Sequence, residues 1–158
     1  MMNMLKRFLL CTVLALGLAS NSFAADVQLD CTNLVLDYAY HRDRPNPVEL
    51  SQLFTEHGSL TVGADTWTGR SAILERLEST RSGPVYRHLM STIRIFPVDD
   101  DHATGVSYVT VYNAPQGQRS VEGFAAIGEY HDDFVLTDEG WKIDKRVFVP
   151  IFFYGDKD

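Results

Sequence analysis

The second half of the chain constrains the fold most, because almost all of it after the break at Ser82-Gly83-Pro84 has the pattern of β-strand. Four runs rich in β-branched and apolar residues follow one another, separated by short turns of Asp, Gly and Pro. We expect strands over residues 85–97, 103–113, 121–137 and 141–153. Long strands joined by short turns pair with their neighbours into an antiparallel sheet.

The first half of the chain predicts helices. Apolar residues recur there at helical spacing, and those of the first stripe are Leu34, Val35, Tyr38 and Ala39. We expect helices over residues 31–43, 48–55 and 69–80, with a hairpin over 59–68. Asp30 and Thr68 are the expected N-caps of the first and third helices. Helices followed by long strands predict an α+β fold, an antiparallel β-sheet with its helices on one face. A strongly curved sheet closed by the three N-terminal helices would form a cone.

The first 24 residues have the features of a secretory signal peptide. Lys6 and Arg7 precede an apolar run that is too short to span a bilayer, and small residues mark a cut after Ala24. We therefore expect residues 1–24 to be removed and residues 25–158 to form one periplasmic or secreted domain. The alternative is a retained membrane anchor.

The charge of the chain argues against some classes of partner. The formal net charge is −7, and the expected cleavage makes it −9, because Lys6 and Arg7 leave with the signal peptide. Nucleic acids and anionic lipids are bound by clustered Lys and Arg, so we expect no nucleic-acid partner and no membrane association after cleavage. Cleavage also leaves Cys31 as the single cysteine, which either packs as a small apolar residue or pairs between subunits.

Three stretches of the chain match the pattern of a known family. The first is the helix ending in Asp43 with the following Leu50-x-x-Leu53-Phe54-x-x-x-Gly58. The others are Arg87-His88-x-x-x-x-Ile93, and Gly128-x-Tyr130-x-Asp132-x-Phe134 followed by Gly140-Trp141-x-Ile143-x-x-Arg146. In their order and spacing they resemble the SnoaL-like group of the nuclear transport factor 2-like superfamily, whose members include scytalone dehydratase and hexachlorocyclohexane dehydrochlorinase. The resemblance implies a cone-shaped fold with a hydrophobic pocket. Because this fold hosts several functions, the function has to be argued from the site.

The resemblance also implies a catalytic pair, Asp43 and His88. In catalytic relatives an aspartate near the end of the first helix pairs with a histidine on the first long strand, and these two residues hold those positions here. An imidazole titrates at about pH 6.5, and a carboxylate that accepts its N–H fixes the tautomer. His88 would then take a proton from carbon or from a hydroxyl. The alternative is structural, a strand histidine bonded to backbone and a helix-end aspartate paired with Arg42 or Arg44.

Five further residues are candidates for substrate binding: Tyr38, Arg94, Tyr108, Tyr130 and Arg146. Tyr130 would donate a hydrogen bond to a substrate oxygen or else is an ordinary core residue, and the same alternative holds for the other tyrosines. Arg94 shares strand parity with the candidate histidine, so it faces the interior if that histidine does. Arg146 either binds an anionic group or pairs with Asp132 or Asp144.

The other titratable residues give weaker signals. Asp37 and His41 are four residues apart on the first helix and form either a rival pair or a surface ion pair. No spacing of ligands predicts a metal site, and Asp99-Asp100-Asp101 is expected to be a solvated turn. Ser107 occupies the position of a second catalytic histidine of scytalone dehydratase, which argues against a dehydratase specifically.

These observations predict an exported small-molecule pocket protein, and as an enzyme a cofactor-independent lyase or isomerase that uses an Asp–His pair for proton transfer. The expected ligand is a small, partly apolar molecule, and we expect no metal and no cofactor. The alternative function is a non-catalytic ligand-binding or protein-interaction module on the same fold. The resemblance further implies a homodimer, for which the apolar tail Val147-x-Val149-x-Ile151-Phe152-Phe153 offers a face.

Overall fold

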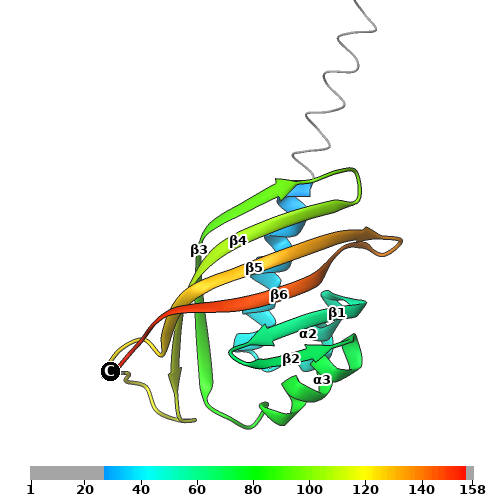
Figure 1. Ribbon diagram of the computed structural model, residues 1–158. Coiled ribbons are helices and arrows are strands. Elements are labelled where there is room, and N and C mark those ends of the chain that lie inside the picture. The colour runs from blue at the N-terminus through cyan, green and yellow to red at the C-terminus, as the bar shows by residue number, and fades with distance from the viewer. Residues whose placement is uncertain (1–26, 156–158) are drawn as a thin grey trace, which may run out of the picture.

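The computed structural model describes residues 27–155, which form an α+β domain (Figure 1). A helix runs through residues 27–43, and the elements after it are α2 (Pro47–Gln52), β1 (Phe54–Val62), β2 (Asp65–Thr68), α3 (Arg70–Ser79), β3 (Val85–Pro97), β4 (His102–Ala114), β5 (Ala126–Thr137) and β6 (Gly140–Phe153). The expected signal peptide lies outside the described residues. Within residues 27–155, no helix is long and apolar enough to cross a membrane.

All six strands belong to one curved sheet in the order β2-β1-β6-β5-β4-β3. Neighbouring strands are antiparallel except for β1 and β6, which are parallel. This parallel pair arises because the chain crosses from β1 and β2 to the far edge of the sheet and then returns strand by strand. The predicted α+β class and the curved sheet are confirmed, and the sheet is open, with β2 and β3 as its edges.

The core lies between the sheet and the helix at residues 27–43. The inward stripe of that helix is at most 4% exposed and consists of Val27, Cys31, Val35 and Tyr38. The stripe belongs to the same apolar cluster as sheet residues such as Ile95, Phe134 and Ile143. Figure 1 shows this helix crossing one face of the sheet, while α2 and α3 lie beside β1 and β2. Burying one face of each element is what holds the two layers together.

The helix boundaries differ from the expectation in three places. The helix expected over residues 48–55 ends at Gln52, and Phe54 and Thr55 belong to β1. Asp30, the expected N-cap, lies inside the first helix, because the buried stripe already includes Val27. Gly69, with φ of 89°, precedes α3 in place of the expected Thr68. A positive φ is readily adopted by glycine and costs energy for other residues, so the turn from β2 into α3 selects glycine.

A bulge in β3 changes which side chains face the interior. Thr92 has φ of 47°, which is uncommon for a β-branched residue, and the pairing with β4 shifts across it. Even-numbered residues such as His88 face inward before the bulge, and odd-numbered residues such as Ile95 face inward after it. The expectation that Arg94 shares the face of His88 is therefore wrong, because one extra residue reverses the alternation.

The end of β6 presents apolar side chains to solvent. Ile151, Phe152 and Phe153 are between 51% and 59% exposed, whereas Val147 and Val149 are half-buried. Contiguous exposed apolar groups are characteristic of surfaces that another molecule covers. The homodimer stays a prediction.

Replacing Ile143 by alanine should destabilise the domain strongly. Ile143 is fully buried in β6, so truncation removes apolar contacts, leaves a cavity and lowers the free energy of unfolding by about 2–5 kcal/mol. Ile151→Ala on the same strand is the matched control, because Ile151 is 51% exposed and its truncation should cost no more than about 0.5 kcal/mol. Urea unfolding followed by tryptophan fluorescence measures both losses, and equal losses would contradict this assignment of the core.

Candidate active site

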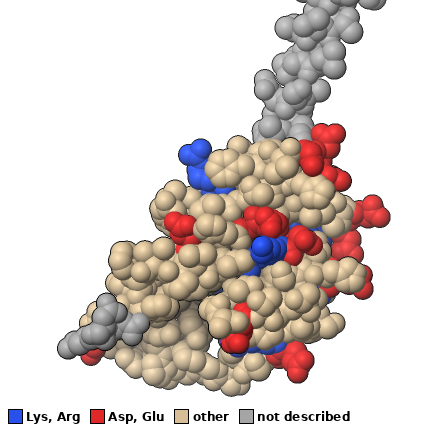
Figure 2. Space-filling view, viewed as in Figure 1, with Lys and Arg blue, Asp and Glu red and all other residues tan. Residues whose placement is uncertain are grey.

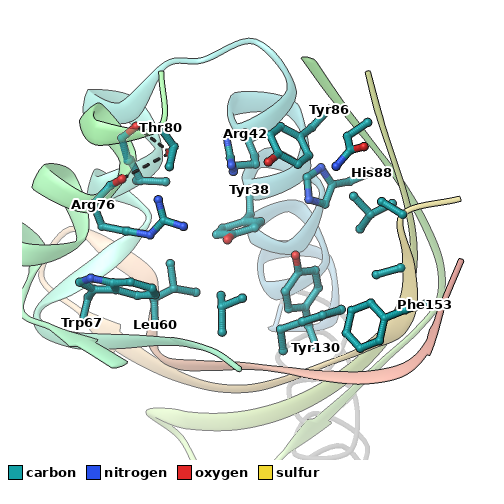
Figure 3. Close-up of a pocket in the computed structure, with 17 residues that line it drawn as sticks. Tyr38, Arg42, Leu60, Trp67, Arg76, Thr80, Tyr86, His88, Tyr130 and Phe153 are labelled. Carbon is teal, nitrogen blue, oxygen red and sulfur yellow. Dashed lines mark hydrogen bonds between the residues drawn. The ribbon is translucent and has the colours of Figure 1, made fainter. Parts of the chain in front are cut away.

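A cavity of about 360 Å³ lies between the helix at residues 27–43, α3 and the inner face of the sheet (Figure 3). Most of its wall is apolar or aromatic. The polar and charged side chains that line it are Tyr38, Arg42, Arg76, Thr80, Tyr86, His88, Asn113 and Tyr130. A cavity of this volume with a few polar groups on an apolar wall is typical of a binding site for a small organic molecule.

The structure brings Asp43 and His88 together at this cavity. Asp43 Oδ1 lies 2.6 Å from His88 Nδ1, and Asp43 Oδ2 accepts a hydrogen bond from the backbone N–H of His88 at 2.9 Å. The two side chains are 9% and 7% exposed. The other ring nitrogen of His88, Nε2, makes no hydrogen bond to any residue from 27 to 155, and the imidazole lines the cavity. One carboxylate therefore holds both the backbone and the ring of the histidine.

The positions of this pair follow from the fold. Asp43 is the last residue of the first helix, and His88 lies on β3, an edge strand whose outer N–H groups need acceptors from outside the sheet. The carboxylate of Asp43 is such an acceptor. Arg87 Nη1 donates to the Asp43 carbonyl at 3.2 Å, so the helix end and the strand edge are joined at several points. The alternative pairing of Asp43 with Arg42 or Arg44 does not occur.

Tyr38 and Tyr130 form an aromatic pair in the cavity wall. Their ring centroids lie 5.5 Å apart in an edge-to-face arrangement, and Figure 3 shows both rings against the cavity. Burial raises the pKa of both hydroxyls, and the nearby Arg146 opposes this only in part. Both hydroxyls therefore keep their protons at neutral pH and are able to donate a hydrogen bond to an oxygen atom in the cavity.

Arg146 is fully buried and is paired with Asp132. Its Nε and Nη2 donate to Oδ1 and Oδ2 of Asp132, each at 2.7 Å, in a bidentate arrangement. The guanidinium carbon lies 4.2 Å and 4.6 Å from the ring centroids of Tyr38 and Tyr130. Burial acts against the charge of Arg146, but the carboxylate of Asp132 outweighs it and raises the pKa of the guanidinium. Of the alternatives that the sequence leaves open for Arg146, the geometry shows pairing with Asp132.

Three of the predicted binding residues do not line the cavity. One is Arg146, which is fully buried, and the other two are exposed. Arg94 is exposed beyond the bulge of β3, with its guanidinium carbon 5.8 Å from the ring centroid of Phe96. Tyr108 is 46% exposed, because the alternation of β4 turns its neighbour Val109 inward and Tyr108 outward. The expectation that Arg94 and Tyr108 face the interior is wrong for both residues.

Sequence reasoning misses several residues of the cavity wall, among them Arg42, Trp67, Arg76 and Tyr86. The available signal for the two arginines is helical spacing. Arg42 follows the buried Tyr38 by four residues, and Arg76 follows the buried Ile73 by three. Arginine usually lies on the exposed face of a helix, so helical spacing alone does not predict that these two residues line a cavity.

The remaining candidate groups lie outside the cavity. Asp37 is exposed and forms no hydrogen bond with His41. Ligand atoms of Asp99, Asp101 and His102 lie within 4.8 Å of one another, but all three residues are exposed. The Asp99 carboxylate already accepts hydrogen bonds from the backbone N–H groups of Asp101 and His102. This segment is an exposed turn, as the sequence indicates.

Comparisons with known proteins agree on the fold. The family model of the SnoaL-like domain matches residues 24–147. An uncharacterized protein of Mycobacterium tuberculosis is 30% identical over 148 residues, which cover 90% of this chain and 97% of that protein. The structure of a candidate scytalone dehydratase from Novosphingobium aromaticivorans has a TM-score of 0.76 at 25% identity and covers 87% of this chain and 93% of its own. A hexachlorocyclohexane dehydrochlorinase structure, at 15% identity, shares the fold with a TM-score of 0.72, covering 84% and 90%.

Replacing Asp132 by asparagine should destabilise the domain. The change leaves the guanidinium of Arg146 buried without a counter-charge, which lowers the free energy of unfolding by about 3–5 kcal/mol. Asp133→Asn is the matched control, because Asp133 is the next residue of β5 and is exposed, so its loss should be no more than about 0.5 kcal/mol. Chemical denaturation measures both variants. A loss for Asp132→Asn no larger than that of the control would contradict the structural role of the pair.

Proposed function

This chain belongs to the SnoaL-like domain family, within the nuclear transport factor 2-like superfamily, and we propose that it catalyses proton transfer on a small, partly apolar molecule. Asp43 and His88 are the acid–base pair of this proposal. The reaction is an elimination or a shift of a double bond, which makes the protein a lyase or an isomerase. One observation carries the proposal, the 2.6 Å contact between Asp43 Oδ1 and His88 Nδ1 with the imidazole on the cavity wall.

The proposed step follows from the geometry of the pair. With Nδ1–H donating to Asp43, the lone pair of His88 Nε2 is the free position of the ring. Nε2 takes a proton from a carbon or a hydroxyl of the substrate, and the electrons of the broken bond form a new double bond while a leaving group departs or a double bond migrates. The imidazolium then gives its proton to the leaving group in an elimination, or to another carbon of the substrate in a double-bond shift. Asp43 stabilises the imidazolium that forms. The hydroxyls of Tyr38 and Tyr130 donate to an oxygen that gains negative charge.

The relatives support an elimination. The solved structures that share this fold include one described as a candidate scytalone dehydratase and one described as a hexachlorocyclohexane dehydrochlorinase. Both names denote the removal of a small molecule from a substrate. An imidazole and carboxylate facing a largely apolar cavity are suited to the proton abstraction that begins such a reaction.

A binding module is the second candidate function. Asp43 also accepts the backbone N–H of His88 at 2.9 Å, so its carboxylate has a structural role that does not require catalysis. In that case the cavity holds a ligand without turnover.

The proposal places the protein outside the cytoplasm. Lys6 and Arg7, the short apolar run after them and the small residues before position 25 support export. A periplasmic or secreted location also means that the substrate is a molecule present in that compartment.

His88→Ala should abolish general-base catalysis by the cavity. The probe reaction is the elimination of 5-nitrobenzisoxazole, in which a base removes the carbon-bound proton, the nitrogen–oxygen bond breaks and a coloured nitrophenolate forms. We expect the wild-type protein to accelerate it above buffer and His88→Ala to lose about 100-fold or more of that acceleration. Asp43→Asn should lose at least about tenfold, because the ring tautomer is no longer fixed.

The control variant is His131→Ala. His131 also bonds a carboxylate, that of Glu129 at 2.8 Å, but the pair is exposed and lies outside the cavity. Its removal should leave the rate unchanged. A wild-type rate equal to that of His88→Ala would exclude His88 as the base and would favour the binding module.

A further inference from the structure

Arg42 and Arg76 place two guanidinium groups in the cavity wall without acidic partners. Both residues line the cavity, and none of the lining residues is Asp or Glu. Within residues 27–155, neither arginine forms an ion pair. Asp43, which is bonded to His88, does not line the cavity. A cation withdrawn from water is stabilised when a counter-charge reaches it, and a bound anion is able to supply that charge.

Each of the two guanidinium groups lies over an aromatic ring. Arg42 Cζ lies 4.4 Å from the ring centroid of Tyr86, and Arg76 Cζ lies 4.8 Å from that of Trp67. The face of a ring attracts the cation, and the five N–H donors of a guanidinium remain able to bond a ligand. Figure 3 shows Arg76 extending from α3 toward the cavity and Arg42 next to Tyr86. The side chains are therefore held in place with their hydrogen-bonding edges available.

Two other arginines differ in this respect. Arg146 is neutralised by the bidentate carboxylate of Asp132, and Arg70 donates to the Phe54 carbonyl and lies 4.0 Å from Glu139. The chain as a whole has a formal charge of −7, and Figure 2 shows acidic side chains spread over the visible face. The cavity wall therefore carries positive charge although the chain as a whole is acidic, and positive charge lining a cleft attracts anions.

We propose that the ligand of this cavity is an amphipathic carboxylate, with its carboxyl group bound by Arg42 and Arg76 and its apolar body against Leu60, Val111 and Phe148. The planar guanidinium matches the two oxygens of a carboxylate. The volume of about 360 Å³ fits a body of one or two rings or a short chain. The proposal rests on the proposed function in one respect, that His88 acts on this same molecule.

The test compares acids with their neutral amides in the wild-type protein. The matched pairs are benzoate and benzamide, 2-naphthoate and 2-naphthamide, and 4-phenylbutanoate and 4-phenylbutanamide, titrated by calorimetry at neutral pH. We expect at least one acid to bind about tenfold or more tightly than its amide, the gain typical of a charge-assisted hydrogen bond. The absence of any acid preference, including the absence of binding by all six compounds, would overturn the proposal.

Variants locate the preference. Arg42→Met and Arg76→Met should each lower the affinity for the preferred acid about tenfold while leaving the amide affinity unchanged, which also shows that the cavity is intact. Arg94→Met is the matched control, since Arg94 also lies over an aromatic ring but outside the cavity. Where a methionine variant does not fold, the lysine variant of the same residue should lower acid affinity to a lesser degree. Acid affinity unchanged in the variants of both arginines would overturn the proposal.

His88→Ala separates this proposal from the proposed function. It should keep the acid preference, because the carboxylate is bound by the arginines, and lose proton abstraction from 5-nitrobenzisoxazole, which is uncharged. An acid preference without any proton abstraction would leave the anion site standing and exclude His88 as a base. Proton abstraction without an acid preference would support His88 as the base and exclude the anion site.

Discussion

A single carboxylate, that of Asp43, joins the two layers of this domain at the place where the cavity begins. It ends the first helix, satisfies the outer N–H of an edge strand and contacts the imidazole of His88. An open sheet has unpaired backbone groups along its edges. In this sheet, the N–H of His88 on the edge strand is bonded by the carboxylate of Asp43 on the first helix. The orientation of the histidine ring is thus a consequence of how helix and sheet are docked. Any movement of the helix end relative to β3 would move the ring as well.

The arginine side chains of the core and of the cavity wall have two different arrangements. Deep in the core, Arg146 and Asp132 neutralise each other, and the rings of Tyr38 and Tyr130 cover the guanidinium. At the cavity, the cations of Arg42 and Arg76 lie on aromatic rings with no carboxylate beside them in the described part of the chain. The first arrangement stabilises a fold, because it leaves no charge unpaired. The second leaves the two guanidinium groups free to bind a ligand. We therefore propose an anion as the ligand of the cavity.

Much of this fold is predictable from the sequence, because its elements have strong local patterns. The four long strands and the buried stripe of the first helix follow from period and turn residues. The bulge at Thr92 has no such pattern, and it alone carries Arg94 away from the predicted face. Residues such as Arg42 and Arg76 face inward through tertiary packing, which helical spacing permits but does not require. The position of Asp43 beside His88 depends on the resemblance to a family, since 45 residues of chain separate the two.

The protonation of the His88 ring tests the role of the Asp43–His88 pair most directly, measured by nitrogen-15 NMR on protein with labelled histidine and assigned by comparison with His88→Ala. We expect neutral His88 to carry its proton on Nδ1, bonded to Asp43, with an unprotonated Nε2 that is free to accept a proton. Asp43→Asn should disturb this tautomer. A neutral ring protonated on Nε2 in the wild-type protein would exclude this role, because the nitrogen toward the cavity would then have no lone pair with which to act as a base.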